Sequence, residues 1–370
     1  MMQVPLVDLS RQQSQIADRI REGFNRVIAE SSFVLGPQVG EFEELWASYC
    51  GVAHAIGVAN GTDAIELALR AAGVGPGDDV LIPANTFVAT AGAVMRTGAS
   101  LVLADCDDDY LLSVEDVERR ITVNTKAVIG VHLYGQTAPM DALRERLGTD
   151  LVLVEDAAQS QGARHNGKRA GSLGTVGATS FYPGKNLGAY GDAGGVMTNS
   201  DEIAQRVQRL RNHGGTAKYE HPEIGFNSRM DTLQAVVLTA KLAILDDWNK
   251  QRAQAAARYD EMLSDIEWVS TPRIAEGNEH VFHLYVVRVP ERDVVVANLN
   301  AAGVGAGIHY PRPVHMHPAY AWLGHSLGAF PRAEQFAGEI LSLPLYPGIT
   351  VDEQQYVVDQ LIRARGKARL

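Results

Sequence analysis

The sequence predicts an α/β protein: a large domain built on a mainly parallel sheet, followed by a smaller α+β domain. At 370 residues the chain is long enough for both. Short apolar runs, several of them followed by a helical stretch, recur up to residue 181: His54–Val58, Val80–Ile82, Leu101–Leu103, Ala127–Val131, Leu151–Val154 and Ala178–Phe181. This alternation is typical of a doubly wound sheet covered on both faces. After Pro272 the pattern changes to a mixture of strands and helices.

The other elements follow from hydrophobic periodicity. Apolar residues at helical spacing predict two N-terminal amphipathic helices, over residues 16–28 and 39–49, and one long helix over residues 230–259. In the C-terminal part we expect strands over 281–289 and 304–310, a helix ending within 298–303, and helices over 331–341 and 351–365. We therefore expect a large domain at residues 1–248 and a small domain at residues 249–370.

Composition excludes several classes of protein. A net charge of −11 argues against a nucleic-acid or anionic-membrane surface. The start of the chain does not resemble a secretory signal, and no apolar stretch is long enough to span a bilayer, so we expect a cytoplasmic protein. Cys50 and Cys106 have neither metal-ligand spacing nor enough partners for a disulfide framework.

The strongest local feature surrounds Lys185, in Ser180-Phe181-Tyr182-Pro183-Gly184-Lys185-Asn186-Leu187-Gly188. Only seven of the 33 basic residues are lysines, and this one follows a strand among aromatic and small residues. A desolvated lysine loses its proton more easily, which favours Schiff-base chemistry. A solvated loop lysine is the equally weighted alternative on this segment alone. A nucleotide P-loop is excluded, because Thr179 and Asn186 stand where that motif needs Gly and Ser or Thr.

Two further segments supply complementary groups. Asp156 ends an apolar strand and is followed by Gln159, and a carboxylate there can keep a pyridine nitrogen protonated. Asn60-Gly61-Thr62-Asp63 precedes a helix, where free N–H groups and a hydroxyl can bind phosphate. Each segment alone is also explained by helix capping or a turn. Together, a lysine, an acid and a phosphate cradle are what pyridoxal 5′-phosphate (PLP) requires.

At this point the chain resembles the DegT/DnrJ/StrS family of sugar aminotransferases. The similar segments appear in the family's order over nearly the whole chain: 32–37, 60–64, 83–90, 132–136, 155–159, 181–195, 211–214 and 226–231. The resemblance implies a fold type I PLP-dependent transferase, which is aspartate aminotransferase-like. It also implies a homodimer whose active sites are shared between the subunits.

The resemblance assigns roles to individual residues. Lys185 would hold PLP and then move a proton between the substrate carbon and the cofactor, and Asp156 would pair with the pyridine nitrogen. Gln159 would lie near the phenolic oxygen and Phe87 would stack on the ring, although a core position explains Phe87 almost as well. The phosphate contacts would be Gly61, Thr62 and Ser180, with Asn227 of the partner subunit.

The loop around Lys185 looks most like that of members that aminate a dTDP-linked 3-keto-6-deoxyhexose. L-glutamate, the family's usual donor, would leave as 2-oxoglutarate. Residues expected near the substrate are Tyr182, Lys218, His309 and Tyr310, with Arg229 as a candidate for the donor carboxylate or for a structural salt bridge. Lys218 as a solvated loop lysine and Tyr310 as a turn aromatic are the alternatives.

Other interpretations stay open at this stage. The family also contains enzymes that act at C4 of a nucleotide sugar or on a keto-inositol. Another fold type I PLP enzyme, such as a β-lyase or aldolase, shares the Asp-to-Lys arrangement. A non-catalytic nucleotide-binding or regulatory protein is disfavoured, because no Gly-x-Gly-x-x-Gly run follows the first sheet strand. For His309, His315 and His317 we expect a substrate-side loop and no metal site, since no acidic or Cys ligand accompanies them.

Overall fold

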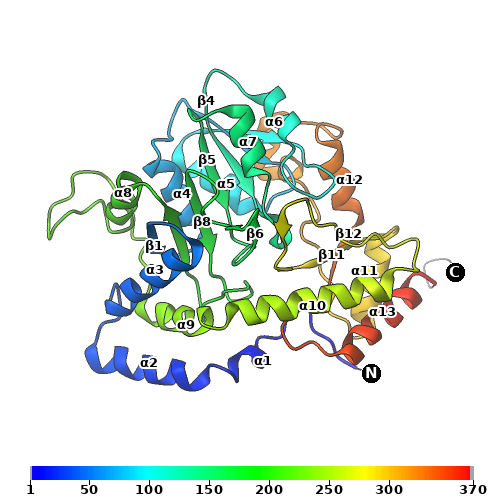
Figure 1. Ribbon diagram of the computed structural model, residues 1–370. Helices are drawn as coiled ribbons and strands as arrows, with labels where there is room; N and C mark the ends of the chain where they lie inside the picture. Colours follow the sequence, from blue (N-terminus) through cyan, green and yellow to red (C-terminus); the bar gives the residue numbers. More distant parts are fainter. Residues whose placement is uncertain (1, 367–370) are drawn as a thin grey trace.

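The computed structural model describes residues 2–366 and has a large central sheet (Figure 1). Its strands are β1 (His54–Val58), β2 (Asp79–Pro83), β3 (Ser100–Ala104), β4 (Thr125–Val131), β5 (Val152–Asp156), β8 (Val176–Ser180) and β9 (Gly194–Thr198). They lie in the order β1-β9-β8-β5-β4-β2-β3. Neighbouring strands are parallel except for β9, which is antiparallel to both β1 and β8. The predicted mainly parallel sheet is confirmed.

Strand β9 was not among the predicted strands. It begins with two glycines, which are depleted in strands. A Cβ atom on Gly194 would lie 2.3 Å from the Asn60 carbonyl oxygen, so only glycine allows this close approach. The strand is buried along its whole length and brings the connection after β1 next to the end of β8.

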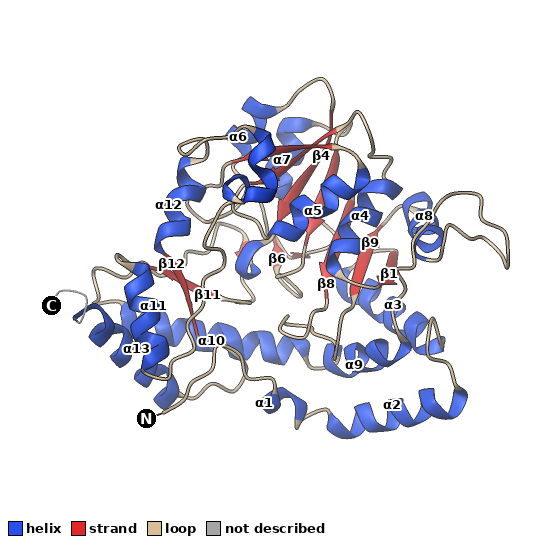
Figure 2. Ribbon diagram, turned by 180° about the vertical axis from the view of Figure 1, so that it is seen from behind, coloured by secondary structure: helices blue, strands red, loops and turns tan. Residues whose placement is uncertain are grey.

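Helices cover both faces of the sheet (Figures 1 and 2). The helices of this part of the chain are α1 (Ser10–Gln13), α2 (Ala17–Glu30), α3 (Pro37–Cys50), α4 (Gly61–Ala71), α5 (Val88–Thr97), α6 (Val114–Arg120), α7 (Met140–Leu147), α8 (Asp201–Arg211) and α9 (Thr232–Leu242). On β2, Val80 and Ile82 pack with residues of α4, α5 and α8, whereas Leu81 packs with residues of α6 and α7. Because side chains alternate between the two faces of a strand, neighbouring residues of β2 belong to the hydrophobic cores on opposite faces of the sheet.

The predicted single helix over residues 230–259 is wrong, because the chain turns at Ala243 and Ile244. Ile244 has a φ of −127°, outside the helical range, and it separates α9 from α10 (Leu245–Leu263). Helix α9 packs against α2 and α3, whereas α10 runs on to α13 (Val351–Gly366). The two halves therefore pack against different parts of the molecule.

The C-terminal part forms its own core from α10, α13 and a two-stranded antiparallel sheet. Its remaining elements are β11 (Tyr285–Arg288), α11 (Arg292–Ala301), α12 (Pro331–Glu339), β12 (Ile340–Leu343) and the 3₁₀ turns η2 (Val314–Met316) and η3 (Pro318–Leu323). The predicted strand over 281–289 is confined to residues 285–288, and helix α12 ends before β12 instead of reaching residue 341. The predicted division at residue 248 lies within α10 and stays a prediction.

The predicted strand over residues 304–310 is wrong. This segment forms only isolated bridges, from Val304 to Val4 and from Gly307 to Ser342. The remaining short elements are η1 (Leu133–Gly135) and a small sheet of β6 (Arg164–His165), β7 (Lys168–Arg169) and β10 (Asn278–Glu279). No helix within residues 2–366 is long and apolar enough to cross a membrane.

Candidate active site

A cavity of about 670 Å³ lies at the carboxyl ends of β4, β5 and β8. This edge is where parallel α/β sheets bind their ligands. Ten of the predicted site residues line the cavity together: Gly61, Thr62, Phe87, Asp156, Gln159, Ser180, Tyr182, Lys185, His309 and Tyr310. Residues from distant parts of the sequence therefore share one pocket.

Asp156 is the last residue of β5 and points to the face covered by α5. Its side chain accepts hydrogen bonds from Thr90 Oγ1 at 2.8 Å and from the Ala158 N–H at 3.2 Å. The residue is only 6% exposed, and no ion pair joins it to a basic side chain within residues 2–366. A buried carboxylate that lines a cavity without a cationic partner is suited to a cationic ligand group.

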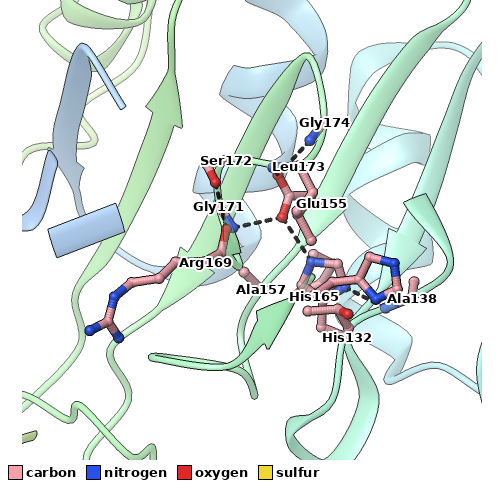
Figure 3. Close-up of polar contacts among 12 residues, drawn as sticks. His132, Ala138, Glu155, Ala157, His165, Arg169, Gly171, Ser172, Leu173 and Gly174 are labelled. Carbon is pink, nitrogen blue, oxygen red and sulfur yellow. Dashed lines mark hydrogen bonds and ion pairs between the residues drawn. The ribbon is translucent and has the colours of Figure 1, made fainter. Parts of the chain in front are cut away.

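The preceding residue, Glu155, points to the opposite face and anchors the end of the strand (Figure 3). Its carboxylate accepts hydrogen bonds from the N–H groups of Gly171, Leu173 and Gly174, each within 2.7 Å, and from His132 Nε2 at 2.9 Å. The Ala138 N–H donates to His132 Nδ1, so the ring proton is on Nε2. This network satisfies a fully buried carboxylate and holds Asp156 in place.

Lys185 lies in the loop after β8. The Lys185 N–H donates to the Tyr182 carbonyl, and the Ala189 N–H donates to the Phe181 carbonyl, which folds the loop back on the strand end. The ε-amino group forms no hydrogen bond to another described residue. Burial lowers the pKa of Lys185 to about 8, and the nearby Asp156 carboxylate opposes this shift. A fraction of Lys185 is therefore neutral and nucleophilic near neutral pH.

The phosphate cradle forms where α4 begins. The Asn60 side chain caps the helix by accepting a hydrogen bond from the Asp63 N–H at 2.8 Å. The N–H groups of Gly61 and Thr62 have no intrahelical partner. A Cβ atom on Gly61 would lie 2.5 Å from the Ser180 Cβ, so glycine allows these two segments to meet. Helix N–H groups and two hydroxyls thus converge on one anion site.

Gln159, Tyr310 and Phe87 are in contact along the wall of the cavity. Gln159 Oε1 accepts a hydrogen bond from the Tyr134 N–H at 2.7 Å, and its Nε2 donates to the Tyr310 hydroxyl at 3.1 Å. The rings of Phe87 and Tyr310 lie 5.0 Å apart. Phe87 is 49% exposed, so the interpretation of Phe87 as a core residue is wrong.

Sequence analysis missed His283, which also lines the cavity. The Asn186 amide nitrogen donates to the Val281 carbonyl and to Asn249 Oδ1, so Asn186 Oδ1 accepts the hydrogen bond from His283 Nδ1 at 3.2 Å. Burial lowers the pKa of His283 well below its usual value, and the charges of Lys185 and Arg252 and the rings of His309 and His280 act in the same direction. The ring is therefore neutral, and its Nε2 is an acceptor without a hydrogen-bond partner within residues 2–366. The sequence did offer one indication of a functional role for His283, since it is a titratable residue within the otherwise apolar run 281–289.

Three predicted residues do not line the cavity of their own chain: Lys218, Asn227 and Arg229. They belong to the connection between α8 and α9, part of which extends away from the body of the molecule (Figures 1 and 2). Asn227 forms a bridge with Asn212 at the end of that connection. Lys218 is exposed, and its ammonium lies 5.2 Å from the centre of the Tyr219 ring. Arg229 donates to the side-chain oxygens of Asn212 and Asn227, at 2.9 and 2.7 Å. It has hydrogen bonds to amides there and no salt bridge within the described chain.

Two of the three histidines considered for a metal site, His309 and His315, have separate environments. His309 lines the cavity and its Nδ1 lies 2.8 Å from Ser342 Oγ, whereas the buried His315 bonds to Glu334 through Nε2 at 3.0 Å. No group of three or more His, Cys, Asp or Glu side chains within residues 2–366 is arranged to hold a metal ion.

These observations fit PLP. The cavity offers an amine that is partly neutral, a buried carboxylate without a basic partner, and an anion cradle in which a Cβ atom at residue 61 would collide with residue 180. Fold and site together define a fold type I PLP-dependent transferase. The family model described as the DegT/DnrJ/EryC1/StrS aminotransferase family matches residues 14–362. The chain belongs to this family; it is a sugar aminotransferase and uses PLP.

Individual relatives match over almost their full length. A transaminase of Streptomyces venezuelae, named for dTDP-3-amino-3,4,6-trideoxy-α-D-glucose, is 43% identical over 358 residues, which cover 96% of this chain and 94% of the relative. A crystal structure of S. venezuelae DesV in complex with a ketimine intermediate has a TM-score of 0.95 at 42% identity, with 98% of each chain covered.

A relative from Geobacillus stearothermophilus carries a different kind of name. It is called a pleiotropic regulatory protein and is 45% identical over 366 residues, with 97% of this chain and 98% of the relative covered. Because the family is one of aminotransferases and the site holds the groups that the chemistry needs, the interpretation of this chain as a non-catalytic regulator is wrong.

Proposed function

We propose that this enzyme transfers the amino group of L-glutamate to C3 of a dTDP-linked 3-keto-6-deoxyhexose and releases 2-oxoglutarate. The observation that carries the proposal is the convergence of Lys185, Asp156 and the cradle at Gly61 in one cavity. The likeness to the S. venezuelae transaminase supports a dTDP-linked 3-amino sugar as the product. A cytoplasmic location stays a prediction.

In this proposal the chain's own residues bind, orient and move protons. Bound PLP supplies an aldehyde for the amino group and a ring that takes up the electrons released at the substrate carbon. Lys185 anchors the cofactor and then carries the proton at its ε-nitrogen, a role that its lowered pKa favours. Asp156, held by Thr90, keeps the ring nitrogen protonated. Gly61, Thr62 and Ser180 bind the phosphate.

The remaining cavity residues orient the ring and the sugar. Gln159 is fixed between Tyr134 and Tyr310, and its amide would bind the phenolic oxygen of the cofactor. Phe87 would pack on the cofactor ring. Tyr182, His309 and Tyr310 line the part of the cavity left for the sugar and can form hydrogen bonds with its hydroxyls.

We further propose a homodimer in which the connection between α8 and α9 enters the partner's site. Asn227 would complete the phosphate cradle and Lys218 would meet the diphosphate of the sugar nucleotide. Arg229 supports this arrangement, because its guanidinium binds the Asn227 side chain and so sets the orientation of the Asn227 amide. Exposed apolar side chains on the segment 33–45, including Phe33, Val34 and Leu45, suit a subunit contact.

The substrate is tested by the reverse reaction. The purified enzyme with PLP, 2-oxoglutarate and a dTDP-linked 3-amino-3,6-dideoxyhexose should form glutamate, and the 4-amino isomer and an amino-inositol serve as comparison substrates. Faster glutamate formation from the 4-amino sugar or the amino-inositol would replace the C3 assignment by one of the two alternatives. No glutamate from any of the three would contradict sugar transamination by this route.

Sharing of the site is tested by mixing two inactive variants. Lys185→Ala removes the anchor, and Asn227→Ala removes a contact expected from the other subunit. If each site uses Lys185 of one subunit and Asn227 of the other, a mixed dimer contains one intact site. Mixing with subunit exchange should restore about a quarter of wild-type activity if the subunits reassociate at random. Activity that stays at the level of the separate variants would argue against sharing.

A further inference from the structure

The first residues of the chain form an N-terminal strap, residues 2–9, that lies on the segment 303–307. The Val4 N–H donates to the Gly303 carbonyl at 2.9 Å, and the Gly305 N–H donates to the Val4 carbonyl at 2.8 Å. Val4 is fully buried in the C-terminal core. The strap is therefore bonded to a segment far away in the sequence.

Glycines on that segment make room for the strap. A Cβ atom on Gly303 would lie 2.6 Å from Gln3 Nε2, and a Cβ atom on Gly305 would lie 2.6 Å from the Leu6 backbone nitrogen. On Gly307 it would lie 3.2 Å from Leu6 Cδ2 and 3.0 Å from the His309 ring. The sequence Gly303-Val304-Gly305-Ala306-Gly307 is thus a track for the strap, which explains why it is not the strand that its pattern predicted.

Arg11, two residues beyond the strap, fixes the chain on that side. Its guanidinium bonds to Glu353 at 2.5 Å, to the Gly348 carbonyl at 2.5 Å and to Asp8 at 3.0 Å. The bidentate contact with Glu353 restrains both partners in one geometry. With Val4 buried at one end and Arg11 bound at the other, the residues between them have a defined path.

This path brings Leu6 and Val7 to the wall of the active-site cavity. Leu6 approaches the track at Gly307, two residues before His309, which lines the same cavity. Neither side chain carries a polar atom. A hydroxyl or carboxylate of the substrate pressed against them would lose its hydration without gaining a hydrogen bond, whereas a methyl group would not.

We propose that the N-terminal strap is a specificity element of the sugar site, and that Leu6 and Val7 select the 6-deoxyhexose by contacting its C6 methyl group. This proposal rests on the proposed function and identifies the part of the chain that recognises C6 of the sugar, which carries no hydroxyl. The hydroxyls of the same sugar are left to polar residues such as His309 and Tyr310.

The test compares two sugars that differ by one oxygen atom: a dTDP-linked 3-amino-3,6-dideoxyhexose and its 6-hydroxyl counterpart, each with 2-oxoglutarate. We expect wild-type kcat/KM to favour the 6-deoxy sugar by about tenfold or more. Val7→Thr replaces one methyl group of the side chain by a hydroxyl and keeps its shape, and Leu6→Asn introduces an amide of similar size. Each substitution should reduce the preference for the 6-deoxy sugar to about twofold. Leu9→Asn, on the exposed end of the strap, is the matched control and should keep it.

The outcomes separate this proposal from the proposed function. Activity with both sugars and an unchanged preference in both the Leu6 and Val7 variants would overturn the role of the strap alone. If the wild-type enzyme were inactive with both sugars, the proposed function would be wrong, and the role of the strap with it.

A second experiment displaces the strap without touching a cavity residue. Gly305→Ala places a methyl group against the Leu6 backbone, whereas Gly338→Ala, with no atom within 4 Å of its Cβ, is the control. Gly305→Ala should speed tryptic cleavage after Arg11 and raise KM for the sugar nucleotide, each by about tenfold. Visible absorption of bound PLP and the half-reaction with glutamate should stay within about twofold. Faster cleavage with an unchanged sugar KM would contradict the proposal.

Discussion

Lys185, which is half-buried, and Lys241, which is buried, are two lysines that differ in their surroundings. Burial lowers the pKa of each to about 8. Lys241 is 4% exposed in α9, where its ammonium donates to the Gly188 carbonyl at 2.5 Å and lies 4.9 Å from the centre of the Tyr190 ring. Lys185 instead lines the cavity, its ε-amino group bonds to no described residue, and the Asp156 carboxylate lies nearby.

A lowered pKa does not by itself make the amine of a lysine reactive. Both lysines are deprotonated more easily than a solvated lysine, yet the Lys241 nitrogen bonds to a carbonyl, lies against a ring and does not line the active-site cavity. Lys241 supports the loop that carries Lys185, because Gly188 is part of that loop. Access to the cavity and the acid across it, and not burial alone, distinguish the lysine that can bind PLP.

The largest expected effect comes from replacing each lysine with methionine, which keeps the length and removes the amine. Lys185→Met should lower kcat by at least about 10⁴-fold, since it removes both the anchor and the proton carrier. Lys241→Met should keep kcat within about threefold. Steady-state rates with glutamate and the keto sugar give the kcat of both variants. An equal loss in the two variants would mean that the distinction between the lysines is wrong.

The next effect is on stability and depends on pH. A lysine whose folded-state pKa is about 8 and whose usual value is 10.5 destabilises the fold fully below pH 8, and this cost disappears as pH rises towards 10.5. A shift of this size corresponds to at most about 3 kcal/mol in the free energy of unfolding. Each Lys→Met variant of the cofactor-free protein should therefore gain stability at pH 7 relative to pH 10.

The same pKa in two different surroundings gives a direct comparison. Since burial lowers the pKa of both lysines to about 8, the two pH-dependent gains should be of about equal size. Denaturant unfolding at pH 7 and pH 10 measures the difference, and any change in side-chain packing caused by either substitution cancels because it is the same at both pH values. A larger gain for Lys185→Met would show that its ammonium is the more poorly solvated of the two.

Features that depend on neighbours in sequence could be predicted. Lys185, Asp156 and Gly61 each lie within four residues of the end of an apolar run. The rule that ligands bind beyond the carboxyl ends of parallel strands was enough to bring them to one edge. The cap at Asn60 and the exposed Phe87 needed the packing of α4 and α5 to be known.

Features that depend on distant partners could not be predicted. Strand β9 exists because Gly194 fits against Asn60, and residues 304–310 are not a strand because the N-terminal strap occupies their glycines. The turn at Ile244 reflects two different packing surfaces for α9 and α10. His283 reaches the cavity through a hydrogen bond to Asn186, across 97 positions of the sequence.

The smallest effect concerns His283, whose neutral Nε2 is a hydrogen-bond acceptor available beside Lys185 but not beside Lys241. His283→Phe removes the acceptor and should lower kcat/KM by about tenfold, while His283→Gln can place an oxygen near the same point and should restore most of it. Loss of an acceptor disfavours the ammonium form, so the pKa of Lys185 in the cofactor-free protein should fall further below its present value of about 8.

Competitive labelling of the amines, followed by mass spectrometry of the peptides carrying Lys185 and Lys241, measures both pKa values in one sample. Lys241 is the internal control, because its nitrogen is enclosed by Gly188 and Tyr190 and should not respond to residue 283. If His283 only fills space, the Phe and Gln variants should lose activity alike and the pKa of Lys185 should not move. A pKa that changes for Lys185 alone, and returns with glutamine, would identify His283 as the positioning residue that makes one lysine differ from the other.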